Sequence, residues 1–232
     1  MCSKFRIPVQ FTTISSMDAP ASRLYEQHGV TIVELNAAKI PSSELEVYAG
    51  YQVGKILLPQ LVLETDRLIL RRFRPEDAEQ CFSFLSNERD AYMDCSKAFP
   101  FRDNGYYERV ALFEQRETQY MIVVKDSHEV IGTVHVFEDN SRAVDAMEIG
   151  YSIAHTHQRK GYAFEALSAL LDLLQDKLCL NMVTAGILPE NIASEKLLLK
   201  LGFQKEGLRH KAVWHEGLDE PVDLVYFYRD RQ

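Results

Sequence analysis

The stretch Tyr151-Ser-Ile-Ala-His-Thr-His-Gln-Arg-Lys-Gly-Tyr-Ala-Phe-Glu-Ala166 decides the fold, because it joins a strand pattern to a helix pattern through a short basic loop. Consecutive backbone N–H groups at a helix N-terminus form a cradle for phosphate groups. Gly161 would let the backbone approach a diphosphate without a Cβ in the way, and Arg159 and Lys160 add positive charge. An ordinary strand-to-helix connection has a similar local pattern. The stretch alone therefore predicts only a candidate phosphate loop.

The segments beside this loop predict a strand, a helix and a second strand. Residues 147–153 have a strand pattern before the loop, and residues 182–188 have one after the helix. Between them, leucines recur with helical spacing on one face, at Leu167, Leu170, Leu171, Leu174 and Leu178. A unit of this length implies a parallel strand pair with a right-handed crossover. Ligands favour the carboxyl ends of such strands.

The remaining patterns extend this unit into one sheet. Further strands are expected at residues 67–73, 119–125, 130–138, 203–214 and 222–228. Further helices are expected at residues 75–85, 104–116 and 192–201. Pro75 opens the first of these helices, whereas Asn191 caps the last one and Gly202 ends it. The order predicts an α/β fold, with a mixed sheet that has helices on both faces.

A change of pattern near Pro59 divides the chain into two parts. Its 232 residues are enough for one large domain, or for one ordinary domain and a small one, at roughly 150 residues per domain. Residues 1–60 show strand signals and one short helix signal, which predict a small N-terminal α+β appendage whose role the sequence does not indicate. Residues 61–232 hold all the motifs and form the main predicted domain.

Composition and charge exclude several classes of function. The net charge of -8 disfavours binding to nucleic acid. The longest apolar stretch is about five residues, far below the roughly 20 that cross a bilayer. The first 17 residues lack the apolar run of a signal peptide, so we expect a cytoplasmic protein without a membrane segment. Metal ligands are absent at recognisable spacing, so we expect no metal site.

Two further motifs flank the loop at a distance. Leu63-Glu-Thr-Asp-Arg-Leu-Ile-Leu-Arg-Arg-Phe-Arg-Pro-Glu-Asp-Ala78 precedes it, and Ile187-Leu-Pro-Glu-Asn-Ile-Ala-Ser-Glu-Lys-Leu-Leu-Leu-Lys-Leu-Gly-Phe-Gln-Lys-Glu-Gly207 follows it. With the three motifs in this order, residues 63–229 resemble a GNAT-superfamily N-acetyltransferase of the RimJ/RimL-like type, the ribosomal-protein N-terminal acetyltransferase branch. The resemblance implies a GNAT-like, largely antiparallel twisted sheet.

The resemblance also implies a site for acetyl-CoA, in a cleft where strands 147–153 and 182–188 part. The loop Q-R-K-G-Y-A fits the family's phosphate loop Q/R-x-x-G-x-G/A at each specified position, although relatives often have a proline and an aromatic residue where this chain has His155 and His157. A backbone N–H near Ile153 would bind the thioester carbonyl, and Asn191 would contact the cofactor. The implied cofactor-binding residues are Ile153, Gln158, Arg159, Lys160, Gly161, Tyr162, Ala163 and Asn191.

Two residues are candidates for proton transfer. Ser194 matches the family's residue near the cofactor sulfur, and its hydroxyl can donate to a leaving thiolate; it could instead serve only the first turn of its helix. Glu148 is the candidate base, because strand alternation puts it on one face with the small residues Gly150 and Ser152; a solvated strand end is the other interpretation. Trp214 and His135 are interpreted as structural.

These observations predict direct, sequential acetyl transfer from acetyl-CoA to a primary amine, without a covalent enzyme intermediate. The resemblance favours a protein N-terminal α-amine as the acceptor. A small amine, such as a polyamine or an aminoglycoside, is the first alternative. A non-catalytic acyl-CoA sensor is the second. The sequence does not predict the oligomeric state.

Overall fold

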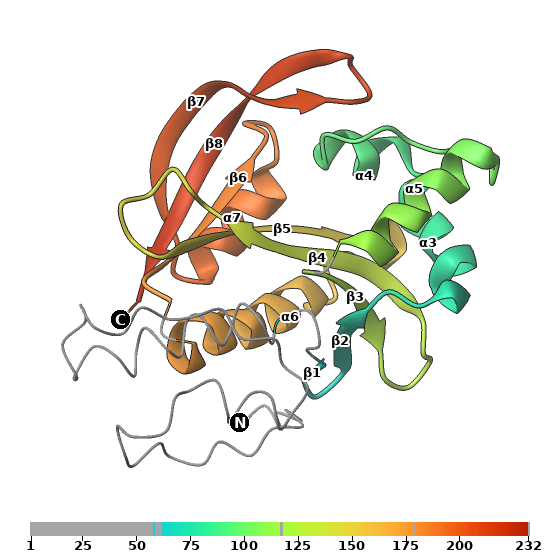
Figure 1. Ribbon diagram of the computed structural model, residues 1–232, viewed down its shortest axis with the longest axis horizontal. Coiled ribbons are helices and arrows are strands. Elements are labelled where there is room, and N and C mark those ends of the chain that lie inside the picture. Colours follow the sequence, from blue (N-terminus) through green and yellow to red (C-terminus); the bar gives the residue numbers. More distant parts are fainter. Residues whose placement is uncertain (1–57, 59–61, 117, 179, 232) are drawn as a thin grey trace, which may run out of the picture.

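The computed structural model describes residues 58, 62–116, 118–178 and 180–231 (Figure 1). The predicted appendage of residues 1–60 lies outside the described residues, apart from Leu58, and the predicted boundary near Pro59 lies outside them too. Leu58 belongs to the main core, where its carbonyl accepts a hydrogen bond of 2.5 Å from the Tyr120 hydroxyl. The appendage therefore stays a prediction, and the fold described below is that of the main domain.

One eight-stranded sheet organises the described part of the chain. Its spatial order is β1-β2-β3-β4-β5-β6-β8-β7, and β5 and β6 are its one parallel pair. The strands are β1 (Leu63–Glu64), β2 (Leu68–Arg72), β3 (Gln119–Val124), β4 (Val130–Glu138), β5 (Ala146–Ile153), β6 (Met182–Ile187), β7 (Gln204–His215) and β8 (Glu220–Asp230). The predicted mixed, largely antiparallel sheet is confirmed, and its parallel pair is the one that the strand, helix, strand pattern implied.

Helices cover both faces of this sheet (Figure 1). Side chains alternate along β3, so that Tyr120 and Ile122 pack in the core with α6 (Tyr162–Leu171), whereas Met121 and Val123 pack with α3 and α5. The other helical segments are η3 (Pro75–Asp77), α3 (Ala78–Leu85), α4 (Glu88–Met93), α5 (Asn104–Gln115), η4 (His155–His157), η5 (Asp172–Lys177) and α7 (Ile192–Lys200). The predicted arrangement of helices on both faces is confirmed.

Three elements differ from the sequence-based expectation. The two-residue strand β1 and the six-residue helix α4 were not predicted, because segments so short carry no readable periodicity. The Asn87 side chain starts α4 by accepting a hydrogen bond from the Asp90 N–H at 2.9 Å. The helix that begins at Tyr162 changes to π-helical geometry over Asp172–Lys177. Of these differences, α4 matters most, because it reaches the site.

The sheet is interrupted between β5 and β6. Residues 146–148 of β5 pair with residues 182–184 of β6, and the pairing stops there although the strands continue to Ile153 and Ile187. On its other side, β5 stays paired with β4 up to Ile153. It is therefore β5 and β6 that part at their carboxyl ends, next to the loop that leads into α6, as the resemblance implied.

Candidate active site

The loop between β5 and α6 carries a row of unpaired backbone N–H groups. Gly161, the N-cap of α6, is left-handed with φ 83°, and Arg159 is left-handed with φ 61°. No backbone carbonyl among the described residues accepts a hydrogen bond from the N–H groups of residues 159–164. Alternating backbone conformations of this kind turn successive N–H groups toward one concave side, and the helix dipole adds positive potential there. The loop thus fits a diphosphate.

Two side chains hold the loop in this shape. The Gln158 amide donates to Asp90 Oδ1 at 2.9 Å and to the Ile153 carbonyl at 3.0 Å, so this side chain ties the loop to α4 and β5. Arg67 donates from Nη1 to the Lys160 carbonyl at 3.1 Å. Gln158 therefore positions the loop through its side chain, and its predicted contact with the cofactor stays a prediction.

An ion pair with Glu165 fixes Arg67 itself, and the sequence alone did not predict it. Arg67 Nε lies 2.6 Å from Glu165 Oε2, and its guanidinium stacks 4.6 Å from the centroid of the Tyr162 ring. Thr65 also donates to Glu165, at 2.5 Å. Arg67 lies inside the motif of residues 63–78, and Glu165 lies one turn after Gly161. Their positions in two of the quoted motifs were the only sign in the sequence that Arg67 and Glu165 matter. Only the fold brings the two side chains together.

The edge of β5 offers backbone donors where β6 has moved away. The Ala154 N–H donates to the Ile131 carbonyl at 2.7 Å, and Ile153 is paired with Gly132. Hydrogen-bonded and non-hydrogen-bonded pairs alternate along antiparallel strands. The N–H groups of Tyr151 and Ile153 therefore point away from β4, toward the gap. An extended ligand in the gap would meet them much as a neighbouring strand would.

The start of α7 forms the opposite edge of the gap. The Asn191 side chain accepts a hydrogen bond of 3.1 Å from the Ser194 N–H, so Asn191 is the N-cap that the sequence predicted. This contact uses the backbone of Ser194 and leaves its hydroxyl for other partners. Both residues line the same cavity as Tyr151. The first turn of α7 can thus offer a side-chain amide and a hydroxyl to a ligand between the strands.

Glu148 lies on the face of β5 opposite to that of Tyr151 and Ile153, at the last position paired with β6. Burial, followed by the negative charge of Asp139, raises the pKa of Glu148 to about 7, while Arg209, Arg142 and the Tyr226 hydroxyl act in the opposite direction. Its predicted neighbours on this face, Gly150 and Ser152, also line the cavity. A carboxylate with such a pKa is poised to accept a proton near neutral pH.

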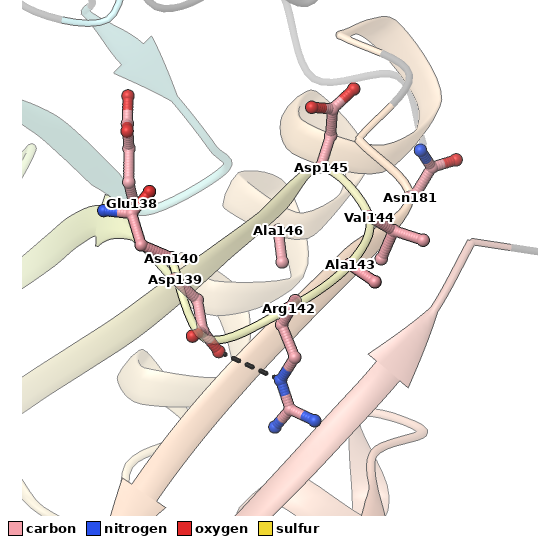
Figure 2. A pocket seen from close by; sticks show the side chains of 9 residues that line it. All are labelled: Glu138, Asp139, Asn140, Arg142, Ala143, Val144, Asp145, Ala146 and Asn181. Carbon is pink, nitrogen blue, oxygen red and sulfur yellow. Dashed lines mark hydrogen bonds and ion pairs between the residues drawn. The ribbon is translucent and has the colours of Figure 1, made fainter.

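Asp139 is the first residue of the β4–β5 connection and lines an open hollow of about 490 Å³ (Figure 2). Figure 2 shows Asp139 and Arg142 pointing toward one another, with Arg142 Nε 3.2 Å from Asp139 Oδ2. The Thr184 hydroxyl donates to the same Asp139 oxygen at 2.8 Å. Although burial opposes it, hydrogen bonds from Ser141, Thr184 and Arg142 lower the pKa of Asp139 to about 2. Asp139 therefore stays charged. Because Thr184 is the β6 partner of Glu148, its hydrogen bond holds the Asp139 charge close to Glu148, the candidate base.

One cavity of about 630 Å³ joins Glu148, the gap beside β5 and the start of α7, whereas Ile153 and the loop residues 158–163 do not line it. Glu148, Tyr151, Asn191 and Ser194 all line it, from both faces of the parted sheet. Side chains from elements far apart in the chain form the rest of its wall, including Asp94 from the end of α4, Arg109 of α5, Arg116 after it, His135 of β4 and Trp214 and Glu216 at the β7–β8 hairpin.

Two of these lining residues, His135 and Trp214, are the ones that the sequence analysis interpreted as structural. Burial, and then the charges of Arg116 and Arg109, lower the pKa of His135 to about 4, so its imidazole is neutral at physiological pH. Trp214 is 55% exposed, although it lines the cavity. Both residues lie where an acceptor could contact them, and no local pattern in the sequence marks either one.

The described residues form neither a metal site nor a helix that could span a membrane. Within residues 58, 62–116, 118–178 and 180–231, no three His, Cys, Asp or Glu side chains come together to hold a metal ion. None of the helices in that part of the chain is long and apolar enough to cross a membrane.

Comparisons with known proteins agree with this geometry. Residues 67–204 match the family model described as an acetyltransferase (GNAT) domain. The uncharacterized N-acetyltransferase YoaA of Bacillus subtilis is 32% identical over 74% of this chain and 98% of its own length. The Escherichia coli [ribosomal protein uS5]-alanine N-acetyltransferase is 29% identical over 65% of this chain and 81% of its own.

A solved structure gives the same picture of the fold. The spermidine N-acetyltransferase of Vibrio cholerae, in complex with CoA and spermine, superposes with a TM-score of 0.56 over 72% of this chain and 97% of its own, at 22% identity. The family match covers more than half of the chain, and several relatives are N-acetyltransferases. With its sheet parted beside a cradle of backbone N–H groups, the chain belongs to the GNAT family and is an N-acetyltransferase.

Proposed function

We propose that the protein transfers the acetyl group of acetyl-CoA to a protein N-terminal α-amine. The observation that carries this proposal is the gap between β5 and β6. It has unpaired N–H groups of the loop at one end and Glu148, with a pKa of about 7, on the acceptor side. A diphosphate on the loop and a thioester in the gap require one extended ligand of the kind that acetyl-CoA provides.

The residues of the chain have separate tasks in this reaction. The N–H groups of residues 159–163 bind the diphosphate, while Asn191 contacts the part of the ligand in the gap. The Ile153 N–H donates to the carbonyl oxygen as negative charge develops on it. Ser194 donates a hydrogen bond to the sulfur that leaves. Glu148 takes the proton of the attacking amine, directly or through a water molecule, so that transfer occurs in one bound complex.

The pKa of Glu148 favours an α-amine over a lysine-like amine. An α-ammonium group has a pKa of about 7.7 to 8.0, close to that of Glu148, so proton transfer between them is nearly balanced in energy. A lysine-like ammonium group, with a pKa of about 10.4, would give up its proton to the same carboxylate against a difference of roughly three pKa units. The uS5-alanine N-acetyltransferase among the relatives supports the same acceptor class.

A polyamine acceptor is the second candidate, because Asp90, Asp94, Glu148 and Glu216 line the cavity. Two of these carboxylates already have partners, however. Asp90 accepts hydrogen bonds from the His155 N–H at 2.8 Å and from Gln158, and Glu216 pairs with Arg109 at 2.5 Å. Asp90 and Glu216 are therefore less available to bind a polycation than their positions in the cavity wall suggest.

The test uses a mixed pool of acceptors with acetyl-CoA and the purified protein. The pool contains a lysine-free peptide that begins with alanine, an N-terminally blocked peptide with one lysine, and spermidine. We expect mass spectrometry to find acetyl groups on the α-nitrogen of the first peptide, and the Glu148→Gln variant to form less of this product. Modification of spermidine or of the lysine alone would overturn the α-amine assignment. Tight binding of acetyl-CoA without release of CoA to any amine would instead favour a sensor.

A further inference from the structure

Tyr151 carries a buried polar group that the reaction above leaves unused. It lies on β5 beyond the last residue paired with β6, and its ring packs against the core that contains α6. Its hydroxyl oxygen is buried and has no hydrogen-bond partner among the residues that the structure describes. A buried hydroxyl without a partner destabilises a fold, and phenylalanine would pack here without that penalty. The hydroxyl thus calls for a partner that a ligand supplies.

The surroundings of the hydroxyl indicate which ligand atom this is. Tyr151 and Ser194 line the same cavity, and the Ser194 side chain interacts with the Tyr151 hydroxyl closely enough to act against the effect of burial on the pKa of Tyr151. Ile153, the proposed donor to the carbonyl oxygen, is two residues further along the same strand and has its side chain on the same face. Tyr151 therefore lies on the strand that carries the proposed carbonyl site, and it lines the same cavity as the start of α7.

We propose that the Tyr151 hydroxyl donates a hydrogen bond to the sulfur of acetyl-CoA as the thioester breaks, beside the one from Ser194. This role rests on the proposed function. In the step, the amine nitrogen bonds to the carbonyl carbon, the carbon–sulfur bond breaks with its electron pair going to sulfur, and the amine proton passes to Glu148. Tyr151 keeps its own proton throughout and stabilises the thiolate only as a donor.

The acidities of the Tyr151 phenol and of the CoA thiol suit a hydrogen-bond donor that keeps its proton. Burial raises the pKa of Tyr151 to about 12, while Ser194 acts in the opposite direction, so the phenol stays protonated wherever the enzyme works. A thiol has an ordinary pKa of about 8.5, so a thiolate can leave near neutral pH without taking a full proton. It needs donors rather than an acid, and hydrogen bonds to charged groups are the stronger kind.

The test measures binding, so that it does not depend on the acceptor. CoA and desulfo-CoA, which has hydrogen in place of the thiol, are titrated calorimetrically into the wild-type protein and Tyr151→Phe. Tyr228→Phe is the matched control, because the Tyr228 hydroxyl donates to Gln204 at 3.0 Å outside the cavity. At about pH 9.5, where the CoA thiol is mostly ionised, Tyr151→Phe should bind CoA about tenfold more weakly than wild type. Desulfo-CoA should bind both equally.

At about pH 6.5 the thiol is protonated, and the difference for CoA should fall below about twofold. Equal CoA affinity of Tyr151→Phe and wild type at both pH values would overturn the proposal. Equal weakening of CoA and desulfo-CoA would also overturn it, because that result reports a change of shape rather than a lost donor. If wild type bound neither ligand, the proposed function itself would fail, and this role with it.

Two further readouts separate a catalytic role from a structural one. Without ligand, Tyr151→Phe should melt at the same temperature as wild type or higher, because it removes a buried group that has no partner. A loss of melting temperature larger than that of Tyr228→Phe would make the hydroxyl structural and overturn the proposal. With acetyl-CoA and the acceptor identified above, kcat of Tyr151→Phe should fall about tenfold while its KM for acetyl-CoA changes little.

Discussion

The site has two walls built from different parts of the protein, namely the loop wall (residues 159–164 and the edge of β5) and the acceptor wall, which belongs to the cavity. On the side of the loop, the groups that face the gap are mainly backbone N–H groups, whose directions follow from β5 and from the first turn of α6. On the acceptor side, the groups are side chains of Asp94, Arg109, His135 and Trp214, which come from three or more separate elements. One wall is therefore fixed by secondary structure, whereas the other depends on tertiary packing.

This difference explains how one fold can keep its donor and change its acceptor. A backbone N–H is present whatever the side chain, so most substitutions in residues 159–164 leave the cradle in place. On the acceptor wall, each substitution changes the shape or charge that an amine meets. Substitutions on one wall should therefore change the function of that wall and leave the other wall unaffected.

The largest effect is expected at Glu148. Glu148→Gln keeps the shape of the side chain but removes the base, so kcat should fall by about 10²- to 10³-fold. The rate of the wild type should rise as pH increases through about 7, where Glu148 loses its proton, and in the variant this dependence should weaken to the rise that deprotonation of the amine itself causes. Acetyl-CoA affinity, measured by calorimetry, should be unchanged. A fall in that affinity as large as the fall in kcat would show that the walls are not independent.

The raised pKa of Glu148 also has a consequence for stability. The folded protein holds this proton more tightly than the unfolded chain, in which a Glu has a pKa of about 4.3. The stabilising effect of the protonated group is complete below the unfolded value and is lost as pH rises through about 7. Glu148→Gln should therefore raise the melting temperature at about pH 8 and change it little at about pH 4. The opposite order would contradict the assignment of the pKa.

On the loop side, the largest effect is expected at Gly161. Gly161→Val should weaken acetyl-CoA binding by about tenfold or more, because a Cβ-branched residue strains the left-handed backbone and crowds the cradle. Gly202→Val is the matched control. Gly202 has φ 85° and an arginine side-chain atom 3.5 Å from its virtual Cβ, while Gly161 has φ 83° and one at 3.4 Å. Both variants should lose similar stability, but only Gly161→Val should lose affinity. If Gly161→Val and Gly202→Val bound acetyl-CoA with equal affinity, the assignment of the diphosphate to this loop would be wrong.

The loop wall could be predicted from the sequence because its signals are local. A strand, a basic loop with Gly161 and an amphipathic helix follow one another without interruption, and backbone geometry then determines where the N–H groups point. Asn191 could also be predicted, as an N-cap residue that precedes a helical pattern. Each of these predictions needed only residues close together in the chain, and the structure confirms the strand, the helix and the cap.

The acceptor wall could not be predicted in this way. Trp214 lies 79 positions after His135 in the sequence, and only the turn of the β7–β8 hairpin brings both to one cavity. The helix α4 was missed because six residues show no periodicity, yet its Asp90 holds Gln158. Arg67 and Glu165 form their ion pair through the packing of α6 beside β2. Such contacts depend on the register of the whole sheet, which no single motif contains.

A smaller effect is expected at Trp214. This side chain is 55% exposed at the cavity wall, so Trp214→Ala should raise the KM for a peptide acceptor about fivefold while acetyl-CoA affinity stays the same. Phe101→Ala is the control, since Phe101 is a 73% exposed aromatic residue that does not line the cavity. Steady-state kinetics with each substrate varied in turn gives both values. An unchanged acceptor KM would return Trp214 to the structural role that the sequence suggested.

The smallest effect is expected at Arg67, which supports the loop wall without contributing to the cradle. Arg67→Gln removes the ion pair with Glu165, but the Arg67 side chain is 48% exposed, and exposed pairs contribute about 0 to 1 kcal/mol. The loss in acetyl-CoA affinity should therefore be about two- to threefold, with no change in acceptor KM. Arg102→Gln is the control, because Arg102 also pairs with a glutamate, at 2.9 Å, and stacks on an aromatic ring, at 4.1 Å, far from the loop in the sequence. If both variants bound acetyl-CoA as the wild type does, the left-handed backbone at Arg159 and Gly161 would hold the cradle by itself. A loss of tenfold or more would mean that a tertiary contact, and not secondary structure, sets the directions of its N–H groups.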